Sequence, residues 1–239
     1  YSKYRAQQIY TWLYKHGAVH TKSMSNLSNR LKLFLDKKCI IQTLSLSKKS
    51  ESDNTVKFLF KTQTDKYIES VSMIDNGRHT VCLSSQVGCN VDCDFCATAT
   101  MGIIRNLSTG EIVDQLGFIR EKVDTPITNI VFMGMGEPFH NYDNVISAAD
   151  IFHSPRGFNL AATRITISTV GILPKIQQFI FEKQQYKLAI SLNAVDDATR
   201  TQIMPVNKKW SLADLIEAGK EYSQLFYYQY IGIIFLLIP

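Results

Sequence analysis

Apolar residues near the start of the chain recur at helical spacing. They return every three or four positions over residues 4–14 and again over residues 27–35, with Gly17 between the two runs. This pattern predicts a small helical domain over residues 1–40.

Beyond residue 40 the apolar runs become short and typical of strands. Residues 55–60 and 66–73 predict two strands, and a turn at residues 75–77 leads into a third run at residues 79–83. We expect a β-rich connector over residues 41–78 that feeds a larger sheet.

Helical and strand patterns alternate over residues 79–239. Ser108 and Glu111 form a capping box that opens a helix, and the continuous apolar run at residues 127–133 is typical of a strand buried on both faces. Further elements follow in alternation at residues 145–152, 164–169, 174 onward, 188–192 and 211 onward. Repeated βα units predict a parallel sheet with helices outside, either as a doubly wound layer or as a closed or partial barrel.

Neither end of the chain has the pattern of a membrane anchor or a signal peptide. The apolar run at residues 230–239 is too short to cross a bilayer, so a buried strand is expected there. The first residues lack the apolar run of a signal peptide, and the expected location is the cytoplasm.

Composition predicts a globular protein, and charge adds a candidate partner. Of the 239 residues, 45% are hydrophobic, which suffices for one sizeable core and a small appendage. The net charge is +5, but residues 1–50 hold ten Lys and Arg against the single acid Asp36. Such a basic face favours nucleic acid as the partner, with an ordinary solvated face as the alternative. The basic residues that would form it include Lys3, Arg5, Lys15, Arg30, Lys32, Lys37 and Lys38.

Four of the five cysteines fall within residues 82–96. In a reducing cytoplasm such a group indicates a metal or redox site rather than a disulfide framework. Cys89, Cys93 and Cys96 have the spacing that holds a [4Fe-4S] cluster on three thiolates, which leaves one iron open for a substrate. The alternative adds Cys82 to make a four-cysteine zinc site, although zinc sites usually show two separated pairs. The remaining Cys39 is expected to be a half-buried thiol.

Polar residues stand where the predicted parallel strands end. They belong to the cysteine segment, to residues 134–137, to residues 168–169 and to residues 191–193. The carboxyl ends of parallel strands meet at one edge of the sheet, which is where α/β proteins bind ligands.

These motifs together resemble a known enzyme family. Residues 81–89, the three-cysteine motif and Gly134-Met135-Gly136-Glu137-Pro138 are similar to those of the dual-specificity 23S rRNA and tRNA adenine-C2 methyltransferases, which are radical S-adenosylmethionine (SAM) enzymes. The resemblance runs from residues 5–9 through residues 165–171 and 188–194 to about Tyr222. A sister family that methylates C8 of the same rRNA adenine shares most of these motifs.

The resemblance implies a partial (β/α)₆ barrel behind a helical accessory domain, and it implies a SAM pocket. Glycine lets a ligand approach the backbone, and a carboxylate at a strand exit complements the α-ammonium of SAM. Capping of strand ends is the alternative role for the two serines among these residues. The residues that match the SAM pocket of the family are Gly136, Glu137, Ser168, Ser191, Leu192 and Asn193.

The resemblance also implies a radical mechanism. C2 of adenine is electron-poor and cannot attack a methylsulfonium, so in this family the cluster reduces SAM to a 5′-deoxyadenosyl radical that activates a methyl group carried on a cysteine. Glu69 matches the residue that accepts the ring proton, and Cys82 matches the thiol that resolves the RNA adduct as a disulfide. A surface glutamate and a buried structural cysteine are the alternatives.

One departure limits what this chain is expected to do. The methyl-carrying cysteine of the family lies in a C-terminal segment, and no Cys follows Cys96 in these 239 residues. We therefore expect a truncated monomer that binds a cluster and SAM, takes electrons from an external donor and recognises 23S rRNA and tRNA, but does not methylate RNA. Alternatives from other classes are a zinc-containing RNA-binding protein and a radical SAM enzyme acting on a small molecule.

Overall fold

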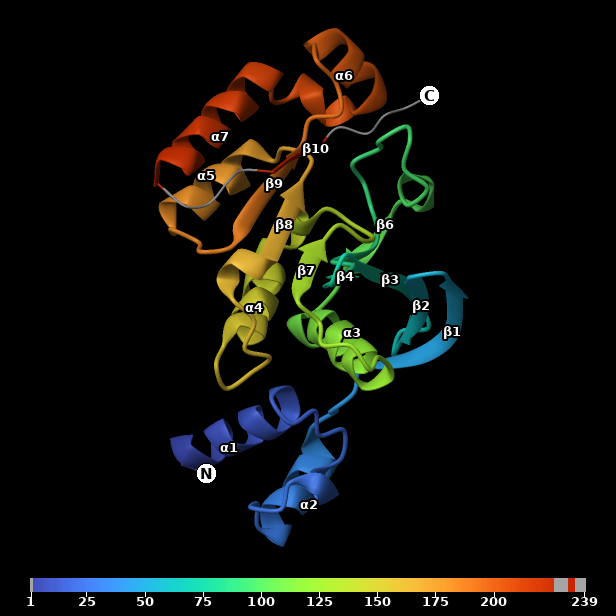
Figure 1. The fold of residues 1–239 in the computed structure, drawn as a ribbon, viewed down its shortest axis with the longest axis vertical. Helices are drawn as coiled ribbons and strands as arrows, with labels where there is room; N and C mark the ends of the chain where they lie inside the picture. Colours follow the sequence, from blue (N-terminus) through green and yellow to red (C-terminus); the bar gives the residue numbers. More distant parts are fainter. Residues whose placement is uncertain (1, 226–231, 235–239) are drawn as a thin grey trace.

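The computed structural model describes residues 2–225 and 232–234 (Figure 1). At the N-terminus, helix α1 (Lys3–Tyr14), the short helix η1 (Thr21–Ser23) and helix α2 (Asn29–Lys38) form what we call the helical segment, residues 2–41. Both predicted helices are confirmed. The segment has a small core of its own, made of Ala18, Met24, Leu27, Leu31 and Leu35.

Four antiparallel strands follow the helical segment. Strands β2 (Thr55–Thr62), β3 (Tyr67–Asp75) and β4 (Arg78–Cys82) are confirmed, and β1 (Leu44–Ser52) is an element that the pattern did not predict. Most side chains of β1 are exposed, so it is held by backbone pairing with β2 rather than by burial of apolar residues.

Strand β4 begins the parallel part of the sheet. The order is β1-β2-β3-β4-β7-β8-β9-β10, in which β7 (Asn129–Phe132), β8 (Ile165–Thr169), β9 (Lys187–Ser191) and β10 (Gly232–Ile234) run parallel to β4. The predicted α/β fold with a parallel sheet is confirmed. Of the closing run expected to form a strand, residues 232–234 do so, and residues 230–231 and 235–239 lie outside the described residues.

Helices connect the parallel strands. They are α3 (Thr109–Lys122), α4 (Tyr142–His153), α5 (Leu173–Phe181), α6 (Asp197–Ile203) and α7 (Leu212–Leu225), of which α6 was not predicted. The expected capping box of α3 forms, because the Ser108 side chain accepts from the Glu111 amide and the Glu111 side chain accepts from the Ser108 amide. The short helices η2 (Ala99–Met101), η3 (Pro138–Asn141), η4 (Ala162–Arg164) and η5 (Pro205–Lys208) complete the connections.

One face of the sheet is packed against helices in a single large core. Alternate residues of β7 and β8, such as Ile130, Phe132 and Ile167, are fully or almost fully buried together with apolar residues of α3, α4 and α5. Among the described residues, no helix combines the length and the apolar character needed to cross a bilayer.

The helical segment attaches at the amino ends of the parallel strands. Arg120, at the end of α3, donates to the Tyr14 carbonyl at 2.9 Å and lies 4.4 Å from the ring centroid of Phe158, which follows α4. The backbone amide and the hydroxyl of Thr43 both donate to Asp114 of α3. Because α3 and α4 end where the next strands begin, these contacts lie opposite the carboxyl edge (Figure 1).

The core makes a direct prediction about stability. Phe132 is 1% exposed and packs near Phe152, whereas Phe181 is 86% exposed. Phe132→Ala should lower the free energy of unfolding by about 3 kcal/mol or more, because it removes a buried ring and leaves a cavity. Phe181→Ala should change it by less than about 0.5 kcal/mol. Urea denaturation followed by circular dichroism measures both, and equal losses would contradict this view of the core.

Candidate active site

A short hairpin closes the base of the cysteine loop, residues 89–102. Strands β5 (Gln86–Gly88) and β6 (Ile103–Asn106) pair on either side of it, and the Cys89 amide donates to the Gly102 carbonyl at 3.0 Å. Gly88 has φ +78°, and a Cβ placed there would lie 1.8 Å from the Gly102 oxygen. No other residue fits this position without moving the loop.

The three cysteines of the loop share one apolar pocket. Cys89 and Cys93 are buried, Cys96 is half-buried, and all three pack with Met204 and Val170 from the carboxyl edge of the sheet. Burial, together with the neighbouring charges of Cys96 and Cys89, raises the pKa of the Cys93 thiol to about 12. The three sulfurs are therefore close enough to interact electrostatically.

This donor set fits an iron–sulfur cluster. Within the described residues, no group of three or more His, Cys, Asp or Glu side chains has the geometry of a single-ion site. A cubane takes each thiolate on a different iron, so its ligands need not converge on one point. The apolar surroundings also suit a cluster, because they limit access of water. Binding of iron would displace the protons that burial holds on the sulfurs.

Cys82 lies apart from these three and shares a sheet face with Glu69. Cys82 pairs with Val71 across β3 and β4, and Glu69 stands two residues before Val71, so the side chains point the same way. Burial raises the pKa of the Cys82 thiol to about 11. Glu69 is half exposed and forms an ion pair with Lys57 of β2 at 3.0 Å.

The two predicted serines project from the same face. Cys82 pairs with Val131 of β7, Val131 with Thr166 of β8, and Thr166 with Lys187 of β9. Ser168 and Ser191 follow Thr166 and Lys187 by two and four residues, and their hydroxyl oxygens are 3.5 Å apart. Glu69, Cys82 and both serines therefore project from the face opposite the helices.

The predicted SAM turn at residues 191–193 divides between the two faces. The Leu192 side chain lines a cavity with Leu215 and Ile233 on the helix-covered face, so only its backbone can serve a ligand on the other face. Its amide already donates to the Ile234 carbonyl at 3.1 Å and its carbonyl already accepts from Arg200 at 3.0 Å, which leaves the second lone pair of the carbonyl. The Asn193 amide donates to the Met204 sulfur at 3.3 Å, which places it beside the cysteine pocket.

Glu137 is a buried carboxylate at the exit of β7. One oxygen accepts from the Phe139 amide and the other from the Val170 amide, both at 2.9 Å, so it joins the exits of β7 and β8. Only 2% of its surface is exposed. Burial raises the pKa of Glu137 to about 7, although these hydrogen bonds oppose the shift. Its charge also acts on Cys89 and Cys93, which places it near the cysteine pocket.

The packing of the protein requires a glycine at position 136. It has φ +97°, and a Cβ there would lie 2.5 Å from the Gln86 Cβ and 2.8 Å from the Gln86 nitrogen. The Gln86 side chain in turn accepts from the Glu137 amide at 2.8 Å. The loop after β7 is thus pressed against the strand that leads into the cysteine loop.

Sequence reasoning missed Arg200, which α6 carries into the centre of the site. Its guanidinium is fully buried and donates to the carbonyls of Val170, Ser191 and Leu192, at the exits of β8 and β9. Burial lowers its pKa, and its positive charge acts on Cys93. The sequence offered no signal, since an Arg in a short polar helix is usually exposed.

The exposure of Cys39 differs from what was expected. Cys39 was expected to be half-buried but is exposed. It directly follows α2, where its amide caps the Leu35 carbonyl at 2.8 Å, beyond the last apolar residue of the buried helix face.

Comparisons with known proteins agree with this geometry. The profile of the Radical SAM superfamily matches residues 83–238, and that of the ribosomal RNA large subunit methyltransferase N-terminal domain matches residues 1–41. The dual-specificity RNA methyltransferase RlmN of Pelobacter propionicus is 42% identical over 221 residues, which cover 92% of this chain. The chain belongs to the RlmN family of the radical SAM superfamily.

Other relatives extend the RlmN comparison. A probable dual-specificity RNA methyltransferase RlmN of Leptospira interrogans is 44% identical over 226 residues, or 92% of this chain and 64% of that protein. The crystal structure of a radical SAM methyltransferase from Sphaerobacter thermophilus has a TM-score of 0.91 and 39% identity, covering 98% of this chain and 70% of that one. The chain spans 63% of the length of the Pelobacter protein.

Glu137 predicts a pH effect on stability. Its pKa rises from an ordinary value of 4.5 to about 7 on folding, so the folded state holds the proton more tightly. The resulting stabilisation is complete below about pH 4.5 and is lost as the pH rises through about 7. The unfolding free energy of the wild type minus that of Glu137→Gln should therefore fall between about pH 5 and about pH 8. Urea titrations across this range test it, and a constant difference would contradict the assignment.

Proposed function

We propose that this chain is the radical-generating part of an RNA methyltransferase that modifies C2 of adenosine in 23S rRNA and in tRNA. The observation that carries the proposal is convergence at one edge of the sheet. Three thiols in an apolar pocket lie beside the exits of β8 and β9, and Glu69, Cys82, Ser168 and Ser191 project from the adjoining face. RNA methylation is the activity in the printed names of the relatives.

Cys89, Cys93 and Cys96 would hold the [4Fe-4S] cluster. When bound, the cluster supplies the electron that cleaves SAM into methionine and a 5′-deoxyadenosyl radical. The pocket of Met204, Val170 and their apolar neighbours excludes water from this chemistry. An external donor must provide the electron.

The remaining edge would bind SAM. Gly136 and Glu137 would receive its amino-acid part, and the hydroxyls of Ser168 and Ser191 with the backbone of Leu192 and the amide of Asn193 would complete the pocket. A carboxylate can accept about four hydrogen bonds, so Glu137 keeps acceptor capacity beyond its two backbone partners. Binding of the α-ammonium would favour the charged form of Glu137 and lower its pKa.

Glu69 and Cys82 would act on the RNA adduct. Glu69 would accept the proton that leaves C2, and Lys57 holds this carboxylate in place through their ion pair. Cys82 would then attack the sulfur of the methyl-carrying cysteine, a residue that these 239 residues do not supply, so that a disulfide forms, the S–CH2 bond to the base breaks, and the base takes up a proton to complete its methyl group. Because burial raises its pKa to about 11, Cys82 must lose its proton to a base before it attacks.

The helical segment would serve as the accessory domain that contacts RNA, with residues 41–78 as connector and residues 79–239 as the radical SAM core. Eight Lys and Arg against one acid in residues 2–41 support this role. We further propose that the protein is a monomer in the cytoplasm, where reducing conditions keep its thiols free.

The division of labour within the reaction can be tested directly. Because the 239 residues contain no Cys after Cys96, the chain should cleave SAM to 5′-deoxyadenosine but leave RNA unmethylated. After anaerobic reconstitution and addition of dithionite, mass spectrometry measures both products. Replacing Cys89, Cys93 or Cys96 by Ala should abolish cleavage, whereas Cys39→Ala should retain it. Detection of 2-methyladenosine would refute this division of labour, and SAM cleavage by the Cys93→Ala variant would refute the proposed cluster site.

A further inference from the structure

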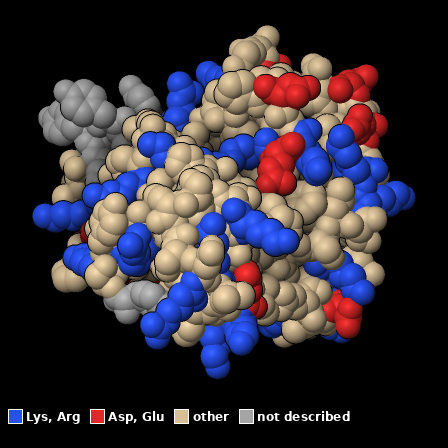
Figure 2. Space-filling model, turned by 90° about the horizontal axis from the view of Figure 1, so that it is seen from below, with Lys and Arg blue, Asp and Glu red and all other residues tan. Residues whose placement is uncertain are grey.

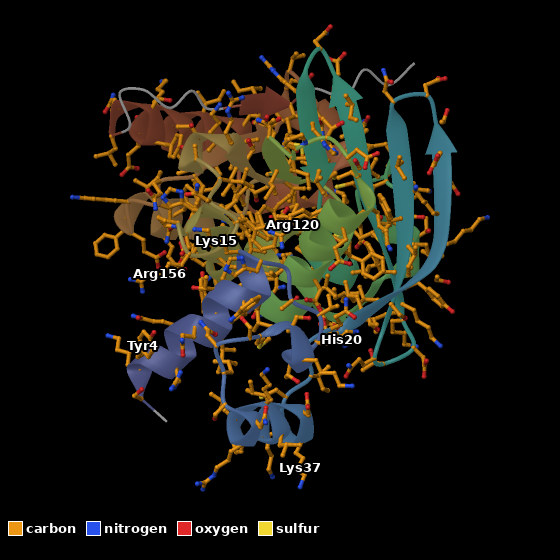
Figure 3. All side chains as sticks on the ribbon, turned by 60° about the horizontal axis from the view of Figure 1, so that its bottom comes forward. Tyr4, Lys15, His20, Lys37, Arg120 and Arg156 are labelled. Atoms are coloured by element: carbon orange, nitrogen blue, oxygen red, sulfur yellow. The ribbon has the colours of Figure 1, made fainter. Side chains whose placement is uncertain are left out.

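A groove of about 370 Å³ lies between α1 and the turn that follows α4. Tyr4 and Trp12 of α1 and His16, which follows α1, supply aromatic rings to it, Gln7 supplies an amide, and Arg156 closes it from the turn that follows α4. Figure 3 shows Tyr4 and Arg156 on the same side of the molecule. Among the described residues that line the groove there is no carboxylate and no aliphatic side chain.

The rings of the groove are held in place by the protein. The Trp12 indole donates to the Asn26 side chain at 2.6 Å and lies with its centroid 4.8 Å from that of His16. Tyr4 is 62% exposed, and its hydroxyl accepts from Gln8 at 3.3 Å. Trp12 also packs, partly buried, against the core of the helical segment, which holds its ring in place. The Tyr4 ring keeps exposed surface for a ligand, with the Arg5 guanidinium 5.7 Å from its centroid.

Two polar groups of the groove remain available. The side chains of Gln7 and Arg156 make no hydrogen bond or ion pair with any part of the chain that the structure describes. A guanidinium can bind a phosphate in bidentate fashion, and an amide can pair with the edge of a base.

The surrounding charge favours an anionic partner. Blue Lys and Arg side chains are spread over the face seen in Figure 2, which looks at the molecule from the end that carries the helical segment. Within residues 2–41 the only acid, Asp36, accepts from Thr21 at 2.8 Å, and no ion pair neutralises the eight basic residues of this described stretch. Lys15, which directly follows α1, lies between the labelled Arg156 and Arg120 in Figure 3.

We propose that this groove binds one unpaired nucleotide of the RNA substrate. The base stacks on the rings of Tyr4 and Trp12, Gln7 contacts its edge, and Arg156 binds a neighbouring phosphate. Stacking on protein rings requires a base whose face is free, so single-stranded segments bind and continuous duplex does not. The proposal rests on the proposed function for the identity of the partner as RNA.

The position of the groove sets its role. Arg156 follows α4, and α4 ends at the amino edge of the sheet, whereas the cysteine loop lies at the carboxyl edge (Figure 1). The bound nucleotide is therefore a different one from the adenosine that reacts. It anchors the RNA at a second point.

Matched substitutions test the groove. Tyr4→Ala and Arg156→Ala should each weaken binding of a single-stranded RNA loop about tenfold, in the range found when stacking contacts are removed. Phe181→Ala removes an exposed ring elsewhere, and Arg164→Ala removes an exposed Arg of η4 that does not line the groove. Both controls should retain wild-type affinity, and Tyr4→Phe should restore it. Fluorescence anisotropy at fixed salt measures all five.

Trp12 provides a second, direct readout. The chain has two Trp residues, so in a Trp210→Phe protein the emission comes from Trp12 alone. Single-stranded RNA should quench this emission, and a duplex of the same length should leave it unchanged. Equal quenching by duplex, or groove variants that bind like their controls, would overturn the proposal.

These measurements need neither the cluster nor SAM, so they separate the groove from the chemistry. A chain that binds and quenches as expected but never cleaves SAM would support the groove and refute the proposed function. If instead the chain cleaves SAM while its groove variants bind RNA like the controls, the proposed function is supported and the groove is refuted.

Discussion

Buried polar groups hold the strand exits together, and the rest of the site depends on them. Carbonyls and amides at the end of a parallel strand have no partner within the sheet and must find one elsewhere. Glu137 accepts the amides of Phe139 and Val170, and Arg200 donates to the carbonyls that follow β8 and β9. These two side chains fix the relative positions of the loops after β7, β8 and β9, at which the candidate SAM-binding residues lie.

The same arrangement explains why opposite charges are kept apart inside the site. Glu137 and Arg200 both act electrostatically on Cys93, yet Glu137 accepts from the backbone amides of Phe139 and Val170, and Arg200 donates to three backbone carbonyls and to the Asn207 side chain. A direct ion pair would satisfy the two charges with each other and leave the strand exits unpaired. Bonding to the backbone instead keeps both charges oriented toward the cysteine pocket, where they can respond to a bound ligand.

Much of this could be predicted from the sequence because the signals were local. The Ser108 capping box depends on neighbouring residues and forms as expected. The run before Gly134 does form strand β7, but it was expected to be buried on both faces, and only Ile130 and Phe132 are buried while Met133 is 43% exposed, because helices cover one face of the sheet and the candidate site lies on the other. Strand β1 could not be predicted, since its Lys and Ser residues are held by pairing with β2 rather than by burial. The role of Arg200 could not be predicted, because its hydrogen-bond partners lie up to thirty residues away in the chain.

Side-chain direction was the other limit of sequence reasoning. Residues 191–193 matched a family motif as a unit, but the structure turns Leu192 toward α7 and Asn193 toward Met204. Gly136 was expected to let a ligand approach the backbone, and the structure shows that its missing side chain also makes room for Gln86. Such distinctions depend on which neighbours the fold brings together, and spacing along the chain does not contain them.

The attachment of the helical segment at the amino ends of the strands has a geometric consequence. The basic surface and the cysteine pocket lie at opposite poles of the sheet, so no short oligonucleotide could touch both at once. Only a folded RNA long enough to reach from one end of the sheet to the other could contact both. The protein would then distinguish RNA substrates first by their three-dimensional shape and only afterwards by the identity of the reacting base.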